Sequence, residues 1–150
     1  MSRGLVTATQ IASVVSAMQN LIMSNSATLG GITQALERDE HPGVALESGY
    51  IPCAYVLPIV EGKLNTEFDM GHDALRMEFP VTVLLYYRAD DLSFIPTNRN
   101  YMLDLIDIVN DNYALGGWQS YKCESEIGYW ESSGDIVHYS INKFLGRLWV

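Results

Sequence analysis

The sequence predicts an α+β domain in which two helices pack on one face of a mainly antiparallel, four-stranded sheet. One segment, Leu75 to Tyr87, alternates in polarity over a longer stretch than any other. Two helical patterns, Thr7 to Met23 and Arg99 to Tyr113, each precede two strand-like segments. Helices followed by strand hairpins are typical of this class. The predicted order is therefore α-β-β-α-β-β within a single domain, residues 1–150.

The segment from Leu75 to Tyr87 is the reference strand of the predicted sheet. Every second residue from Met77 onward is apolar, which is the side-chain period of a strand. The residues between them are polar at first and apolar at Leu84 and Tyr86. We therefore expect one face to be buried throughout and the other to be buried at one end. Because proline cannot donate to a ladder, Pro80 predicts an edge, a bulge or a free N–H side.

The N-terminal segment from Thr7 to Met23 has apolar residues at the three-and-four spacing of an amphipathic helix. Its first residue or Thr9 can cap it. Serine, asparagine and glycine between Ser24 and Gly31 end this helix. We expect Ile32 to Arg38 to add two further helical turns and Val44 to Ile51 to be irregular.

Pro52 to Val60 is the first predicted strand, and its two prolines indicate an edge position or a bulge. Glu61 to Asp73 is polar and contains two glycines, so we expect it to form the long tip of a hairpin with the reference strand. Arg88 to Pro96 is predicted to be a loop. Thr97 or Asn98 then caps the second helix.

The C-terminal third of the chain predicts a second strand pair. Trp118 to Tyr129 alternates weakly, and Glu131 to Asp135 has the composition of a turn. Ile136 to Val150 is the last predicted strand. Its apolar alternation changes phase, which predicts a bulge near Asn142 or Lys143.

The composition limits the classes of partner. The chain has 18 acidic residues against 9 Lys plus Arg, a net charge of −9, and no cluster of basic residues. Binding to a phosphate backbone depends on such cations, so specific nucleic-acid binding is not expected. Cys53 and Cys123 are isolated, which favours reduced, buried thiols. We expect neither a signal peptide nor a membrane span.

Residues that carry chemistry do not form a recognisable site. His41, His72 and His138 lack companions at metal-ligand spacing, and we expect His138 to be a strand residue bonded to a neighbour. Gly30-Gly31 and Gly116-Gly117 are predicted turn glycines, because neither pair has the context of a phosphate loop. Nucleophile motifs such as GxSxG are missing from the sequence. We therefore predict no catalytic, cofactor-binding or metal-binding residues, and no enzyme.

Apolar residues in predicted loops point to association. Polar loops normally expose little apolar surface, so these side chains either fold back onto their own core or meet a neighbouring copy. Under the second hypothesis the candidate residues for the subunit or tube interface are Leu64, Phe68, Met70, Leu92, Phe94 and Ile95.

From Pro52 to Val150 the chain resembles the tail terminator proteins of tailed bacteriophages. The features that carry the resemblance are, in order, PCAYVLPIV, a long polar tip, MEFPVTVLLYY, NYMLDLIDIVNDNYALGG and DIVHYSINKFLGRLWV. The departures are the long segment from Ser24 to Ile51 and a short C-terminus.

This resemblance implies a virion protein that forms a homohexameric ring at the phage neck. The ring would cap the tail tube, contact the tail-tube protein and the head-closure or connector protein, and let DNA pass through its lumen without specific binding. It would be assembled in the host cytoplasm, without a membrane or a cofactor.

Two alternatives stay open at this point. The chain could be another neck or tail component, such as a head-closure or tube protein. It could also be a small α+β enzyme or ligand-binding domain with a buried pocket near His138 and Tyr139.

Overall fold

The computed structural model describes residues 3–37, 51–58, 65–69, 74–112, 115–132 and 134–149. Over these residues the elements are α1 (Arg3–Ser24), β1 (Ala35–Glu37), β2 (Cys53–Pro58), β3 (Asn65–Asp69), β4 (Ala74–Ala89), the 3-10 turn η3 (Leu92–Phe94), α2 (Ile95–Asn110), β5 (Trp118–Ser132) and β6 (Asp135–Trp149). The predicted α+β class is confirmed.

The sheet is mixed. Its strand order is β1-β2-β4-β6-β5, with β3 paired to β4 beside this path. β2, β4, β6 and β5 are antiparallel neighbours, whereas β1 runs parallel to β2. The prediction of four strands in the order α-β-β-α-β-β was wrong, because β1 and β3 add two strands before the second helix.

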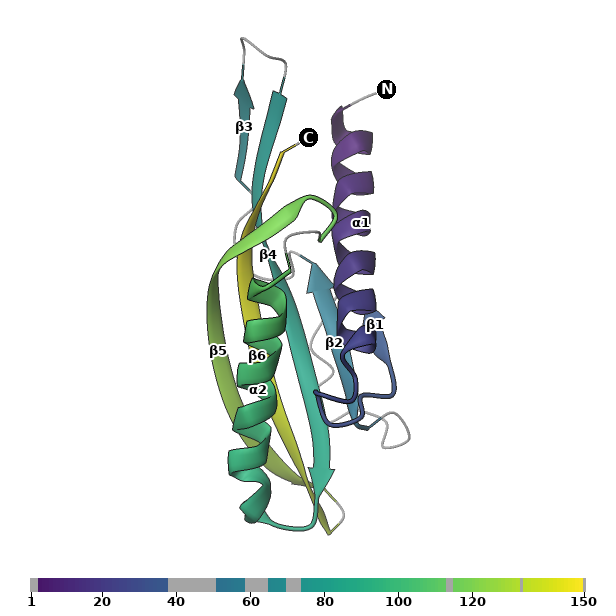
Figure 1. The fold of residues 1–150 in the computed structure, drawn as a ribbon, viewed down its shortest axis with the longest axis vertical. Helices are drawn as coiled ribbons and strands as arrows, with labels where there is room; N and C mark the ends of the chain where they lie inside the picture. Colours follow the sequence, from purple (N-terminus) through teal and green to yellow (C-terminus); the bar gives the residue numbers. More distant parts are fainter. Residues whose placement is uncertain are drawn as a thin grey trace.

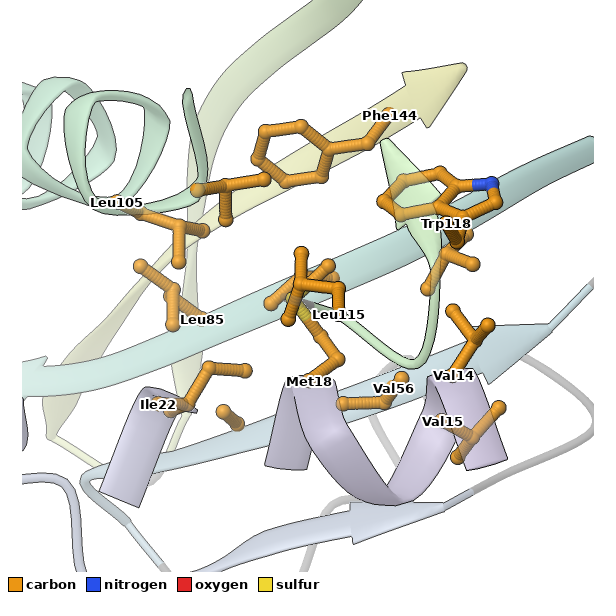
Figure 2. Close-up of a cluster of buried hydrophobic side chains, with 14 of the residues drawn as sticks. Val14, Val15, Met18, Ile22, Val56, Leu85, Leu105, Leu115, Trp118 and Phe144 are labelled. Atoms are coloured by element: carbon orange, nitrogen blue, oxygen red, sulfur yellow. The ribbon is translucent and has the colours of Figure 1, made fainter. Parts of the chain in front are cut away.

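Both helices cover the same face of the sheet (Figure 1), α1 over β1 and β2 and α2 over β5 and β6. Figure 2 shows side chains of both helices meeting those of the strands in one layer. The fully buried residues of this layer, the helix-side core, include Val14, Met18, Ile22, Val56, Leu85, Leu105, Trp118 and Phe144. Trp118 fixes one end of this layer, since its Nε1 donates to the carbonyl oxygen of Phe79 at 3.3 Å.

β4 has the two faces that its sequence predicts. Alternate residues from Met77 to Tyr87 belong to the helix-side core and are at most 3% exposed. On the opposite face, Arg76 and Glu78 are half-buried, while Leu84 and Tyr86 are 1% and 0% exposed. The buried end of that face is a second apolar cluster, which includes Cys53, Tyr55, Leu57, Leu84, Tyr86 and Val137.

β1 replaces the helical turns predicted for Ile32 to Arg38, within which residues 32–37 are described. Thr33 N donates to Pro52 O at 2.9 Å and Ala54 N donates to Gln34 O at 2.8 Å. These bonds pair the segment with the free edge of β2, so tertiary pairing overrides a weak local helical pattern. β1 covers only Ala54 to Val56 of β2, and Pro58 lies beyond it, where no donor to β1 is required.

β3 corrects the prediction that Glu61 to Asp73 is the tip of a hairpin, because five residues of that segment pair with β4. β2 pairs with β4 as far as Pro58 opposite Val81, and β3 resumes with Asn65 opposite Glu78. Six residues, 59–64, therefore separate the two pairings on one side, and two residues of β4 separate them on the other. Phe79 and Pro80 fall between the two partners, where a residue without an N–H disrupts no ladder bond.

The second helix begins earlier than predicted. Neither Thr97 nor Asn98 caps it, because α2 begins at Ile95 with Pro96 in its first turn. Proline is favoured there, since the first N–H groups of a helix have no partner within it. α2 ends at Asn110 rather than at Tyr113, and its Leu103 is 48% exposed.

The first helix also begins earlier, and it runs through Thr7 and Thr9 rather than being capped by either. Ser24 ends it, as the sequence indicates.

The predicted bulge near Asn142 or Lys143 is not in β6. The register shift lies in β5, between Ser120 and Lys122. β6 alternates without interruption, but its apolar residues change face along it. Val137 belongs to the second cluster on the far face, whereas Phe144 belongs to the helix-side core. On the helix side, the positions before Phe144 are the buried polar residues His138, Ser140 and Asn142, so the change of phase in the sequence records a change from polar to apolar residues on one buried face.

Gly146→Ala should destabilise the fold, because a Cβ at this position would overlap the buried indole ring of Trp118. We expect a loss of about 1–3 kcal/mol in the free energy of unfolding, which is typical of overpacking. Urea denaturation measures it. The matched control is Gly128→Ala, whose Cβ would meet the phenol end of the half-buried Tyr139, a group able to turn away. Equal losses in both variants would contradict this account.

Candidate functional site

β3 and the first residues of β4 form an extension of the sheet, here called the arm (Asn65–Asp69 with residues 74–78), which is a two-stranded ribbon at its tip. It extends past the C-terminal end of β6 (Figure 1). β6 pairs with β4 only from Arg76, opposite Trp149, so Ala74 and Leu75 pair with β3 alone. A ribbon of two strands is at best marginally stable by itself. The arm is therefore the part of the described sheet best placed to gain order from a partner.

A polar network on the far face of the sheet fixes the base of the arm. Glu78 of β4 lies directly opposite Arg147 of β6, and the Nε of Arg147 is 3.7 Å from its carboxylate. Tyr121 of β5 donates a hydrogen bond to the same carboxylate. The guanidinium of Arg147 also lies 4.3 Å from the centre of the Tyr121 ring. Three strands are thus joined at one carboxylate, which holds the base of the arm in one orientation.

The charge of Glu78 is favoured by this network. The hydrogen bond from Tyr121 is the largest cause that lowers the pKa of Glu78 below its usual value, and the guanidinium groups of Arg147 and Arg76 add to it. The same hydrogen bond raises the pKa of Tyr121. The groups of this network are partly accessible to solvent, so it orients the arm more than it stabilises the fold.

The loop from Asp90 to Ile95 lies between β4 and α2. Asp91 accepts a hydrogen bond from Ser93 N at 2.8 Å, and its contacts with Ser93 hold the pKa of the Asp91 carboxyl below its usual value. This bond caps η3 and presents Leu92, which is 45% exposed, to solvent. An apolar side chain of this exposure, held on an ordered turn, fits a contact surface.

Phe94 follows Leu92 but packs against the chain itself. Its ring centre lies 5.8 Å from that of Tyr87, 6.2 Å from that of Tyr101 and 5.0 Å from that of His138. Ile95 is half-buried at the start of α2. For these two residues the structure therefore favours the hypothesis that the loop folds back onto its own core.

Four of the six predicted interface residues are described, and they lie on two separate segments of the chain. Phe68 lies in β3 opposite Leu75. Leu92, Phe94 and Ile95 lie on the β4–α2 connection, of which only Leu92 is largely exposed. Leu64 and Met70, together with His41 and His72, lie outside the described residues.

Two hollows flank the end of β4. One, of about 320 Å³, is lined by Gly30, Ile51, Pro52, Tyr87, Arg88, Phe94 and Tyr101. The Tyr87 hydroxyl beside it donates to Leu29 O at 2.6 Å, and burial raises the pKa of Tyr87. The other, of about 210 Å³, contains the carboxylates of Asp90, Glu131 and Asp135, the last lying 3.4 Å from the Nε of Arg88.

The two cysteines are free thiols. Cys53 is buried, as predicted, and burial raises the pKa of its thiol to about 11, so it is protonated and unreactive at neutral pH. Cys123 is only half-buried. Among the described residues, no group of three His, Cys, Asp or Glu side chains is arranged to hold a metal ion. No helix within the described ranges is both long and apolar enough to cross a membrane.

Neither the models of known protein families nor the curated proteins contain a match to this chain.

The network at the base of the arm was not predicted from the sequence. Arg76 and Glu78 were recognised as the polar end of β4, but Tyr121 is separated from Glu78 by 43 residues. The only local signal is Arg147, a charged residue within an apolar C-terminal segment.

Tyr121→Phe should move the titration of Glu78 upward, toward the ordinary range of a glutamate, because it removes the hydrogen bond that favours the carboxylate. Since the pKa of Glu78 is lowered in the folded state, the bond favours folding above the unfolded pKa of this group and loses its effect as the pH falls. Carbon-detected NMR titration of the Glu78 carboxyl measures the shift. The control is Tyr129→Phe, a similarly exposed residue of β5. An unchanged Glu78 titration in Tyr121→Phe would contradict the proposed network.

Proposed function

We propose that this chain is a structural subunit of a bacteriophage neck, a tail terminator that assembles into a ring, which we take to be hexameric, and caps the tail tube. In this role it joins the tube to the head-closure or connector protein, and DNA passes through the lumen. The proposal starts from the resemblance in the sequence from Pro52 to Val150. The described structure agrees with that resemblance in its general class, α+β with both helices on one face.

The observation that carries the proposal is the arm. At its tip the arm is a marginal two-stranded ribbon, and at its base Glu78, Tyr121 and Arg147 join β4 to β5 and β6. This combination of a rigid base and an extended ribbon suits an element that reaches a neighbouring subunit or the tube below. Rings require a heterologous contact, in which one surface of a subunit meets a different surface of the next.

Leu92 supplies a second surface of the kind that a heterologous contact needs. It lies on the connection that follows the opposite end of β4 from the arm, so the two surfaces are separated along the longest strand of the sheet. Contacts of the arm with one neighbour therefore leave Leu92 available for another.

The charge of the chain supports passage of DNA rather than binding. A net charge of −9 on each subunit would make a ring strongly acidic, and an acidic lumen repels phosphates. The same features would also serve a head-closure or tube protein, which is the alternative position within the virion. A purified ring that adds to tube ends distinguishes a terminator from a tube subunit, which would extend the tube.

The native mass of the purified protein should be a multiple of the 16.8 kDa chain, six-fold for a hexamer, either in solution or after addition of tail tubes. Light scattering over a range of concentrations, with negative-stain images of the same fractions, measures this.

A variant that lacks residues 64–70 tests the role of the arm, because the deletion removes β3 and none of the residues of the helix-side core. We expect a folded chain, judged by circular dichroism, that fails to form rings. A protein that is monomeric both alone and with tubes would overturn the proposed function. If the deletion variant forms normal rings, the arm is not part of the subunit interface.

A further inference from the structure

The outer edge of β5 has no partner strand among the described residues. β5 is the last strand in the sheet order, and within the described chain it pairs with β6 alone. Its 15 residues make this a long edge, which is covered only at its start, where Leu115 forms a bridge to Trp118. Such an edge presents a row of N–H and C=O groups on which a further strand can form.

The first half of this edge has features by which proteins prevent edge-to-edge pairing. The register shift between Ser120 and Lys122 interrupts the regular ladder. Lys122 is exposed and lies 3.2 Å from the carboxylate of Glu124. Bulges and charged side chains, lysine above all, disfavour the approach of another strand. A partner strand is therefore not expected over residues 119–124.

The second half of the edge, from Ile127 to Trp130, lacks these features. Its sequence, IGYW, contains no charged residue and no proline. Ile127 and Tyr129 lie on the helix side of the sheet, opposite Ser140 and His138, yet they are 36% and 48% exposed. Large apolar side chains exposed on an edge that nothing protects indicate a contact surface.

A cavity between α2 and β5 lies beside this segment. Its volume is about 120 Å³, and it is lined by Ile95, Asn98, Ile127, Gly128, Tyr129 and His138. The side chains of Ile127 and Tyr129 are therefore not fully packed against the helix, and apolar surface remains on the side where a further strand would add.

The other free edges of the described sheet do not fit this segment. β1 has only three residues, and the carbonyl oxygen of Ala35 already accepts a hydrogen bond from Gln19 Nε2 at 3.0 Å. β3 carries Glu67 and Asp69, so its approach would set acidic residues against the acidic residues of β5. A second copy of β5 is the best complement that the described chain offers.

Two copies of β5 related by a two-fold axis form an antiparallel pair, in which opposite residues lie on the same face. With the axis at Gly128, Ile127 of one copy lies opposite Tyr129 of the other, twice, and Glu126 lies opposite Trp130. A β-branched residue opposite an aromatic one is a favourable cross-strand pair. Both exposed apolar side chains are thereby covered, and no acidic side chain within residues 125–131 faces another.

Charge disfavours other positions of the axis. An axis at Glu124 or Glu126 sets a carboxylate against its own copy, and an axis at Ser125 sets Glu124 against Glu126. Like charges directly opposite each other are destabilising. An axis at either neighbour of Gly128 leaves one apolar side chain opposite a polar one. The register centred on Gly128 is therefore the one that the sequence of β5 favours.

We propose that the outer edge of β5 is a docking surface for a second copy of this chain. Residues 125–131 of the two copies pair in antiparallel fashion about Gly128, and the described helices of both copies lie on one face of a continuous sheet. The contact is isologous and closes on itself, so it joins two chains and no more. It uses neither the arm nor Leu92, so it does not depend on the proposed role in a phage neck.

Sedimentation velocity of the full chain over a range of concentrations measures the association, and we expect a dissociation constant in the micromolar range. Amide hydrogen exchange locates it. Alternate amides of residues 125–131, those that face away from β6, should exchange at least ten-fold more slowly well above the dissociation constant than well below it. The variant that lacks residues 64–70 separates this contact from the proposed ring, because the deletion leaves β5 intact. We expect two chains per particle from it.

A pair of charged substitutions tests the register. Ile127→Glu and Tyr129→Lys should each weaken the association at least ten-fold, because each sets a charge against an apolar side chain. The double variant should recover most of this loss, because the axis at Gly128 sets the two opposite charges against each other. Met23→Lys, at a 39% exposed position of α1, is the control and should change nothing. Circular dichroism checks that each variant is folded.

A folded deletion variant that stays monomeric at the highest concentration reached would overturn the proposal. Particles of more than two chains from that variant would also overturn it, because β5 would then pair with a different edge. So would association that Ile127→Glu leaves unchanged, or a double variant that associates no better than the weaker of the two single variants.

Discussion

The structure depends on β4 being buried on both faces at one end. Its alternate residues from Met77 to Tyr87 face the helices, while Leu84 and Tyr86 face the second apolar cluster. A fully buried aliphatic or aromatic side chain contributes about 1.5–3 kcal/mol relative to an exposed one, so this end carries much of the apolar stabilisation of the described chain. β2, β3 and β6 all pair with β4. The positions of both helices, the arm and the cavity therefore follow from this strand.

The opposite end of β4, residues 74–78, is available for contacts with other subunits because its far face is not part of an apolar cluster. There the far face carries Arg76 and Glu78 rather than apolar side chains, so this end does not need a second cluster to bury it. Pro80 marks the change, because β3 pairs with β4 as far as Glu78, before the proline, and β2 pairs with β4 from Val81, directly after it. One strand thus combines a core segment with the arm, and the proline lies between them without breaking the pairing with β6.

Elements with a regular alternation of apolar residues were predictable from the sequence. Strands that form only because they hydrogen-bond to a neighbouring strand were not. The alternation of Leu75 to Tyr87 predicts both faces of β4, and the predicted bond of His138 to a neighbour is present as its contact with Asp91 O. β1 has only three residues and exists because β2 offers free hydrogen-bonding groups. β3 is polar and short, so no period identifies it. Neither strand carries a local signal.

The candidate sites show the same division between local and long-range information. The sequence left open whether Leu92 and Phe94 pack inward or stay exposed, because the inward packing of Phe94 depends on Tyr87 and His138, which lie on two different strands. A pocket near His138 was one of the alternatives that the sequence left open, and a cavity is present there. Its second polar residue, Asn98, was interpreted as a helix cap, because nothing in the sequence places it beside β6.

Amide hydrogen exchange of the native chain tests the central role of β4 most directly. If the fold depends on this strand, the amides from Val81 to Tyr86 that are bonded within the sheet should be the slowest to exchange, and should do so only through global unfolding. Those of α1 and β5 should exchange earlier, through partial opening. Exchange of the β4 amides at a lower free energy than those of α2 or β5 would contradict the account, because the core would then survive the loss of the strand assigned to hold it together.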